Sequence, residues 1–250
     1  MILKAKGIHK YFVVQRGIFK QDMQKVCALD DVSFALEEFQ TLGIVGESGS
    51  GKTTLAKIIL NLIPASSGRI VFDPQKITNF RKDVQIIFQN PYNSLNPKMR
   101  IKDTLSEPLL IHNIVSRKQI KTKLIDLLRA VGLDETILNR RPSEFSGGQR
   151  QRICIARALA TEPKIVVLDE PISSLDLTVQ VQMLDLFKEL KEKFHLTYIF
   201  ISHNLAVIKY IADTVIVMQN GRIVEQASPA DIFRHPANAY TKQLIQAARA

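Results

Sequence analysis

The sequence predicts an α/β protein with a mixed, mostly parallel core sheet and helices on both of its faces. The first supporting observation is that short apolar runs alternate with segments of helical periodicity, as is typical of this class. The second is a glycine-rich turn at Gly46, between an apolar run and a helical one. The third is the pair Asp169-Glu170, which ends another apolar run. Because such sheets bind ligands at the carboxyl ends of their strands, we expect a functional site there.

The individual elements follow from local patterns. Alternating apolar residues near the N-terminus predict two antiparallel strands joined by a polar and basic loop. An Asn220-Gly221 turn between two β-prone runs predicts a hairpin near the C-terminus. The expected strands are 2–14, 26–36, 42–45, 84–88, 165–168, 198–201, 214–218 and 222–225. Helices are expected at 53–61, 101–112, 118–131, 150–160 and 231–248.

We expect these elements to form one domain with three parts. Residues 91–144 show helical periodicity without a buried strand, which indicates a helical insertion. Residues 1–90 and 145–228 should form the core together with an antiparallel β subdomain, and 229–250 a C-terminal helical element.

Composition limits the class of protein. The chain has 250 residues, of which 46% are hydrophobic and 23% charged, as in ordinary globular proteins. Its net charge of +10 favours an anionic partner such as a nucleotide or a lipid surface. Nucleic acid is not expected, because Lys and Arg form no run of five and do not interleave with aromatic residues. A membrane span and a secretory signal are not expected either. Cys27 and Cys154 lack metal-ligand or redox spacing, and Cys154 lies in an apolar stripe typical of a buried thiol.

The glycine-rich turn predicts a phosphate-binding loop, Gly46-Glu47-Ser48-Gly49-Ser50-Gly51-Lys52-Thr53, which we call the phosphate loop. Its glycines let successive N–H groups point at phosphate oxygens, and the following helix adds its positive N-terminal end. Lys52 is expected to reach the β- and γ-phosphates of ATP, and Thr53 to ligate Mg²⁺. The expected ATP-binding residues are Gly46, Glu47, Ser48, Gly49, Ser50, Gly51, Lys52, Thr53 and Thr54.

Polar residues at the ends of three predicted strands indicate the hydrolytic chemistry. Asp169 is expected to hold Mg²⁺ and Glu170 to act as the general base that polarises the attacking water. Gln89 ends the strand at 84–88, and its amide is expected to meet Mg²⁺ and that water. His203 ends the strand at 198–201 and is expected to donate to the γ-phosphate. The Mg²⁺ ligands are thus predicted to be Thr53, Gln89 and Asp169.

A second phosphate-facing element is predicted at Ser146-Gly147-Gly148-Gln149, which we call the signature turn. Ser146 is a good N-cap, and the glycines leave the N-terminus of the next helix bare for an anion. Because the helical insertion separates this turn from the phosphate loop, we expect it to engage the nucleotide of a second subunit. Asp176, in the segment Ser173-Ser174-Leu175-Asp176, is expected to bridge to that subunit.

This set of motifs, in this order, resembles the nucleotide-binding domain of ATP-binding-cassette (ABC) transporters, a P-loop NTPase fold. The resemblance implies that two cassettes sandwich two ATP molecules head to tail, with each phosphate loop facing the other cassette's signature turn. It implies two integral membrane permease subunits and, indirectly, an extracytoplasmic solute-binding protein. The location implied is peripheral, at the cytoplasmic face of the membrane. It also implies an aromatic residue stacked on adenine, for which the family spacing favours Phe12 over Tyr11.

Two segments resemble the dipeptide, oligopeptide and nickel importers of that family: Gln89–Pro97, which in relatives touches the permease, and His235–Leu244. Pro91 and Pro97 are expected to break helix formation and stiffen this docking segment. The chain departs from the family at Phe39-Gln40, Asn90 and Phe145, none of which removes a catalytic group.

Four questions remain open from the sequence. The end at Ala250, without the longer cysteine-containing tail of many peptide-importing relatives, favours nickel or a metal chelate over peptides. The second cassette is expected to be a related chain, although self-pairing is the alternative. An exporter cassette remains an alternative to an importer. A non-transport ATPase acting on DNA or ribosomes is another alternative, although such relatives carry a long coiled coil or two cassettes in one chain.

Overall fold

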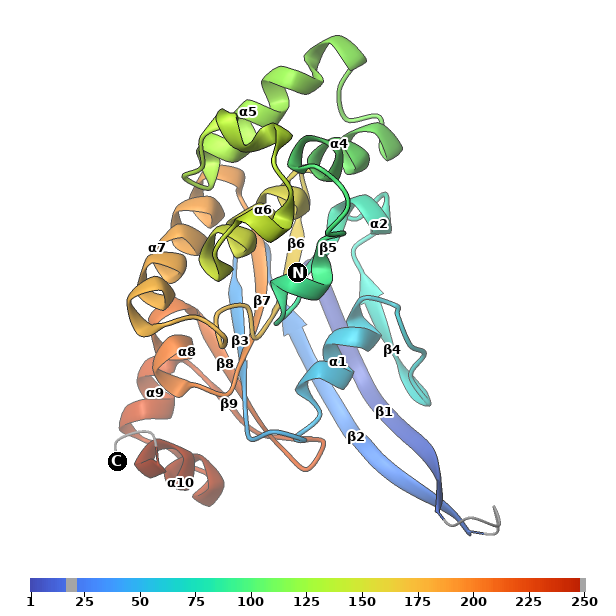
Figure 1. Cartoon of the computed structure of the whole chain (residues 1–250). Helices are drawn as coiled ribbons and strands as arrows, with labels where there is room; N and C mark the ends of the chain where they lie inside the picture. The colour runs from blue at the N-terminus through green and yellow to red at the C-terminus, as the bar shows by residue number, and fades with distance from the viewer. Residues whose placement is uncertain (17–21, 248–250) are drawn as a thin grey trace. The chain divides into compact units, whose positions relative to one another are not determined.

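The computed structural model describes residues 1–16 and 22–247 and is shown in Figure 1. The chain divides into two compact units. The first contains residues 1–76 and 199–250, and the second contains residues 77–198. The predicted α/β class, with a mixed sheet, an antiparallel sheet and helices, is confirmed.

An antiparallel sheet in the first unit has the strand order β2-β1-β4. Its strands are β1 (Leu3–Arg16), β2 (Asp22–Leu36) and β4 (Ser67–Phe72). The two predicted N-terminal strands are therefore present, and they extend further toward each other than expected. Residues 17–21, which belong to the predicted loop, lie outside the described residues. Strand β4 was not predicted, because most of its residues are exposed and its apolar run, Ile70-Val71-Phe72, is only three residues long.

Strands β3, β8 and β9 of a mixed sheet lie in the same unit, and they place the phosphate loop. β3 (Thr41–Val45) is fully buried and pairs in parallel with β8 (Thr214–Gln219), which pairs antiparallel with β9 (Arg222–Ala227). Asn220 and Gly221 both have positive φ, as the tight turn of this hairpin requires. Helix α1 (Lys52–Ile59) follows the phosphate loop, and α8 (Leu205–Ile211) packs on β3.

The C-terminal element of this unit consists of two short helices, α9 (Pro229–Arg234) and α10 (Ala239–Ala247). The prediction of one helix over 231–248 was wrong. The break falls at His235, which precedes Pro236, because the proline ring disfavours the α conformation of the residue before it.

The second unit contains the parallel pair β5 (Val84–Ile87) and β6 (Ile165–Asp169) and most of the helices. Strand β7 (Thr197–Ser202) spans the boundary between the units. The helices are α2 (Phe80–Asp83), α3 (Pro91–Ser94), α4 (Ile101–Ile111), α5 (Ile120–Ala130), α6 (Gly147–Leu159) and α7 (Leu177–Phe194). Three 3₁₀ turns lie at Arg117–Gln119, Glu135–Asn139 and Pro142–Glu144.

Pro91 and Cys154 of the second unit carry two of the predictions made from the sequence. Pro91 does not break a helix but begins α3, because its fixed φ suits the first helical position. Cys154 is buried as predicted, and desolvation raises the pKa of its thiol to about 11.

Candidate nucleotide site

The phosphate loop needs glycine where other backbone atoms approach it. A Cβ on Gly46 would lie 2.2 Å from the carbonyl oxygen of Met218 in β8, and one on Gly51 would lie 2.6 Å from that of Ala28 in β2. A Cβ on Gly49, whose φ is +84°, would have no neighbour within 4 Å. The loop is therefore packed against strands at both ends and open at Gly49, as a cradle for phosphate oxygens requires.

Lys52 lies within this loop and is only 5% exposed. Its ammonium donates to the carbonyl oxygens of Gly46 and Glu47, both at 2.7 Å, and to the Ser50 hydroxyl at 3.3 Å. The Lys52 ammonium is thus held by carbonyl and hydroxyl oxygens of the loop itself. Phosphate oxygens can replace these oxygens as its hydrogen-bond acceptors. Thr53, at the start of α1, is exposed, and Thr54 is half-buried beside it.

Two aromatic residues of β1 are candidates for stacking on adenine. Phe12 is 39% exposed with the Lys10 ammonium 5.1 Å from its ring centre, and Tyr11 is 41% exposed and stacks on His9 with 6.3 Å between ring centroids. Desolvation and the neighbouring Cys27 raise the pKa of Tyr11. Both rings are accessible, so the preference for Phe12 stays a prediction.

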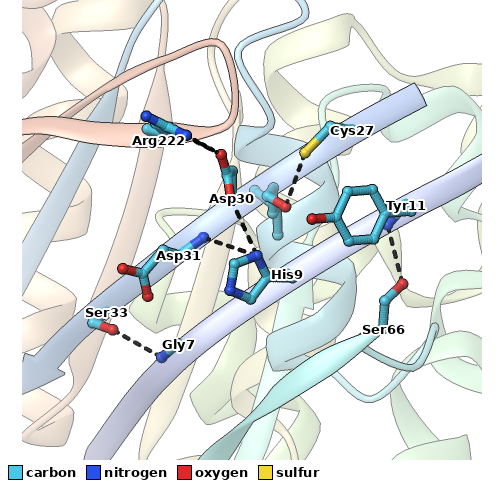
Figure 2. A network of polar contacts seen from close by, with 10 residues as sticks. Gly7, His9, Tyr11, Cys27, Asp30, Asp31, Ser33, Ser66 and Arg222 are labelled. Atoms are coloured by element: carbon cyan, nitrogen blue, oxygen red, sulfur yellow. Dashed lines mark hydrogen bonds and ion pairs between the residues drawn. The ribbon is translucent and has the colours of Figure 1, made fainter. Parts of the chain in front are cut away.

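A polar network beside Tyr11 links β1 and β2 to the β8–β9 hairpin (Figure 2). Arg222 of β9 donates to Asp30 of β2, and the other carboxylate oxygen of Asp30 lies 3.2 Å from Nδ1 of His9. The Arg222 guanidinium lowers the pKa of Asp30. Gly221 in the hairpin turn donates its N–H to the Ser50 carbonyl at 3.1 Å. The hairpin therefore braces both the antiparallel sheet and the phosphate loop.

In the second unit, the structure brings Gln89 and Glu170 together. The Gln89 side-chain amide donates to a carboxylate oxygen of Glu170 at 3.1 Å and to the Ser173 hydroxyl at 3.3 Å. Glu170 is half-buried directly after β6, and its φ of 50° is left-handed. Such a backbone costs about 1–2 kcal/mol for a residue with a side chain, and these conformations cluster at functional sites. Asp169, at the end of β6, is 7% exposed.

The signature turn begins α6 with reciprocal capping. The Ser146 hydroxyl accepts from the Gln149 N–H at 3.3 Å, and the Gln149 side chain accepts from the Ser146 N–H at 3.1 Å. A Cβ on Gly148 would lie 3.0 Å from Val179 of α7, so glycine allows the close approach of α7. The first turn of α6 therefore presents its backbone rather than side chains.

This turn opens into a cavity of about 690 Å³ within the second unit. The lining residues come from the segment after β5, the signature turn and the start of α7: Gln89, Asn90, Pro91, Tyr92, Ser146, Gly147, Gly148, Ser174, Leu175, Asp176 and Val179. Asp176 caps α7 by accepting from the Val179 N–H at 3.0 Å, which gives it a structural role. Its bridge to a second subunit stays a prediction. His203 is exposed, one residue beyond β7 in the first unit.

The residues that hold the signature helix α6 and the phosphate loop in place were not predicted from the sequence. Arg150 stacks on Tyr92, with 3.9 Å from its guanidinium carbon to the ring centre, and donates to the Pro142 carbonyl at 2.7 Å. It thereby joins α3, in the docking segment, to the signature helix α6. Tyr240 of α10 accepts a hydrogen bond from the Glu47 N–H, 193 residues away. The local sequence contains no signal for either contact, because each joins segments far apart in the chain.

No helix in residues 1–16 and 22–247 combines the length and apolar character needed to cross a membrane. The phosphate loop, the signature turn and the fold together define the nucleotide-binding cassette class of P-loop ATPases. The chain belongs to the ABC transporter family, whose family model matches residues 29–173.

Its relatives include two peptide-transport proteins. The oligopeptide transport ATP-binding protein AppF of Bacillus subtilis is 41% identical, over 98% of this chain and 77% of AppF. The di/tripeptide transport ATP-binding protein DppF of Pseudomonas aeruginosa is 44% identical, over 98% of this chain and 78% of DppF. A solved dimer of the ATP-binding cassette MJ0796 in a post-hydrolysis state with ADP and Pi matches with a TM-score of 0.76 and 26% identity, over 91% of this chain and 99% of that one.

Proposed function

We propose that this chain is the ATP-binding and ATP-hydrolysing subunit of an importer, working as a head-to-tail dimer of cassettes on two membrane permease subunits. The family and the named functions of the relatives support this proposal. Those names also favour peptides over nickel or metal chelates as the transported class, against the preference drawn from the end of the chain. The proposed location is peripheral, at the cytoplasmic face of the membrane.

The observation that carries the dimer proposal is the cavity at the signature turn. A helix N-terminus attracts anions, and α6 presents a glycine turn to an open cavity whose described lining residues include no lysine or arginine. Lys52, in contrast, lies in the phosphate loop of the other unit, held by three acceptors. We therefore infer that the signature turn receives the γ-phosphate of a nucleotide bound to a second cassette's phosphate loop.

Magnesium is proposed as the metal, with Thr53, Gln89 and Asp169 as its protein ligands. Oxygen donors suit this hard cation, which is usually bound by one or two carboxylates together with substrate phosphates. Within the described part of the chain, no cluster of three or more His, Cys, Asp or Glu side chains could hold a metal ion. When bound, the ion would neutralise charge that develops on the phosphates.

Glu170 is proposed as the general base, with Gln89 holding its carboxylate and His203 donating to the γ-phosphate. Glu170→Gln should lower kcat for ATP by about 10²–10⁴-fold, the usual contribution of a general base, and should trap an ATP-bound dimer on a sizing column. Glu162→Gln is a matched control, because Glu162 also has a left-handed backbone (φ 54°) and lies outside the site. Wild-type turnover in the Glu170→Gln dimer would refute the assignment.

A mixing experiment tests the intermolecular site. Lys52→Ala and Gly148→Val chains each lack one half of the proposed site, so each alone should be inactive. In a mixed dimer, the intact phosphate loop of one chain meets the intact signature turn of the other. Mixing should therefore restore part of the ATPase activity. No recovery, with mixed dimers demonstrated by affinity-tag pull-down, would contradict the proposal. Mixed dimers that form only with a related cassette would show that the partner is that related chain.

A further inference from the structure

Tyr240 connects the C-terminal helix α10 to the phosphate loop. Its side chain is 6% exposed, and its hydroxyl oxygen lies 3.0 Å from the backbone nitrogen of Glu47, whose N–H it accepts. Burial raises the pKa of this hydroxyl, so it stays protonated at neutral pH and above. A side chain from the last helix therefore bonds directly to the loop at which nucleotide binding is proposed.

The peptide unit that Tyr240 contacts also holds Lys52. The Glu47 N–H and the Gly46 carbonyl belong to one planar peptide group, and that carbonyl accepts from the Lys52 ammonium at 2.7 Å. Because the group is rigid, fixing its N–H also fixes the direction of its oxygen. The hydroxyl of Tyr240 thus constrains where the ammonium of Lys52 rests.

The start of α10 is itself tied to β9. Glu225 of β9 accepts from the Ala237 N–H at 2.8 Å and from the Asn238 N–H at 3.0 Å, one with each carboxylate oxygen. Asn238 in turn accepts from the Tyr240 N–H at 2.8 Å. Desolvation opposes ionisation of Glu225, but the hydrogen bonds to its carboxylate outweigh it and lower its pKa. Tyr240 is therefore held in place by a carboxylate that is charged at neutral pH.

The same hairpin also contacts the phosphate loop directly. Gly221, in the turn before β9, donates its N–H to the carbonyl of Ser50 at 3.1 Å. The loop is thus held near both of its ends, at Ser50 by the hairpin and at Glu47 by the helix that the hairpin anchors. A brace of this kind preorganises the loop, so that less conformational freedom is lost when a ligand binds.

We propose that Tyr240 is a positioning residue for the phosphate loop, through which α10 sets the affinity for ATP. This inference rests on the proposed binding of ATP at the loop. It gives the C-terminal element a role in the nucleotide site: any displacement of α10 releases the Gly46–Glu47 peptide and weakens nucleotide binding.

The test removes only the hydroxyl. Tyr240→Phe in the full chain should raise the Kd for ATP, measured by competition with a fluorescent ATP analogue, by about five-fold, the value of one neutral hydrogen bond. The KM for ATP should rise by the same factor, and kcat should change by less than about two-fold, because the hydrolytic residues are untouched. Glu225→Gln should weaken ATP binding in the same direction.

Tyr198→Phe is the matched control. It also removes a buried tyrosine hydroxyl bonded to the backbone, at the Phe187 carbonyl 3.1 Å away, but in the second unit. It should lower the melting temperature and leave the Kd for ATP unchanged. Hydrogen exchange of the peptide containing residues 46–52 should accelerate in Tyr240→Phe and not in Tyr198→Phe.

The outcomes separate the two proposals. A wild-type chain that binds ATP, together with a Tyr240→Phe chain that binds it equally well, would overturn the positioning role and leave the proposed function standing. A wild-type chain that binds no ATP would overturn the proposed function, while the exchange measurement would still test the bond between Tyr240 and the loop. Unchanged exchange in the 46–52 peptide would overturn the positioning role in either case.

Discussion

Two glycines of the phosphate loop should respond to the same substitution differently: one mainly in stability, the other mainly in affinity for ATP. In Gly46→Ala the new Cβ would lie 2.2 Å from the Met218 carbonyl oxygen, whereas ordinary contacts begin near 3.4 Å. The backbone must therefore move by about 1 Å, next to the register pair Val45–Val217 of strands β3 and β8. Overpacking of this kind costs about 1–3 kcal/mol, and loss of a ladder hydrogen bond adds about 1 kcal/mol. We expect a total of about 3 kcal/mol.

Gly49→Ala places its Cβ in open space, with no atom within 4 Å. Only the left-handed backbone, with φ +84°, penalises the side chain, at about 1–2 kcal/mol. The same open space is where the phosphates are proposed to bind. Gly49→Ala should therefore keep most of its stability and lose most of its affinity for ATP, whereas Gly46→Ala should be damaged in its fold.

Thermal unfolding with and without ATP measures both effects. For a chain of this size, 1 kcal/mol shifts Tm by about 2–4 °C, so Gly46→Ala should melt about 6–12 °C below wild type and Gly49→Ala about 2–8 °C below. ATP at 100 times its Kd should stabilise wild type by about 2.7 kcal/mol, and it should stabilise Gly49→Ala far less. The packing argument fails if Gly46→Ala melts within 2 °C of wild type, or if Gly49→Ala is the less stable of the two.

Three further predictions follow from individual contacts. Maleimide at pH 8 should label the folded chain at Cys27, which is exposed, and not at Cys154, whose buried thiol has a pKa of about 11. Mass spectrometry of the digested protein measures the labelling of each cysteine. Equal labelling of the two would show that Cys154 is accessible and contradict the prediction. Arg150→Ala should lower ATP turnover more than ATP affinity. It removes the stack on Tyr92 and the bond to the Pro142 carbonyl, which join the docking segment to helix α6. A change in the Kd for ATP without a change in turnover would contradict this prediction. Glu225→Gln should be less stable than wild type at pH 7, and the difference should vanish on acidification. The folded-state pKa of Glu225 lies below its usual value near 4.5, so its stabilisation is present above that pH and is lost as the pH falls through the folded value. Urea unfolding at pH 7 and pH 3.5 would show a constant difference if the carboxylate charge played no part.

The nucleotide motifs could be found in the sequence because each acts through its own backbone. A run of glycines followed by Lys52 specifies a loop that directs N–H groups inward, wherever the loop sits in a fold. Ser146 and Gln149 similarly cap their own helix, and the observed reciprocal bonds lie within four residues of chain. Buried strands such as β3 and β6 were likewise visible, because continuous apolar runs mark strands covered on both faces.

Elements whose local sequence pattern is weak or interrupted were not predicted correctly. Strand β4 exposes most of its residues and is a strand because β1 pairs with it, which no local pattern reveals. The break between α9 and α10 depends on one proline, and Pro91 begins a helix where a helix-breaking loop was expected. Propensity is a weak guide at such positions, because tertiary contacts decide between several local conformations.

The sequence by itself therefore determined the class of this protein, the positions of the phosphate loop and the signature turn, and the residues proposed for hydrolysis. Only the tertiary structure decided how those residues are held: Gln89 on Glu170, Arg150 on Tyr92, and Tyr240 on the peptide that carries the Lys52 ammonium. The physical reason is sequence separation. A motif encodes the conformation of its own few residues, whereas contacts across 81 and 193 positions exist only once strand pairing and helix packing have brought distant segments to the same place.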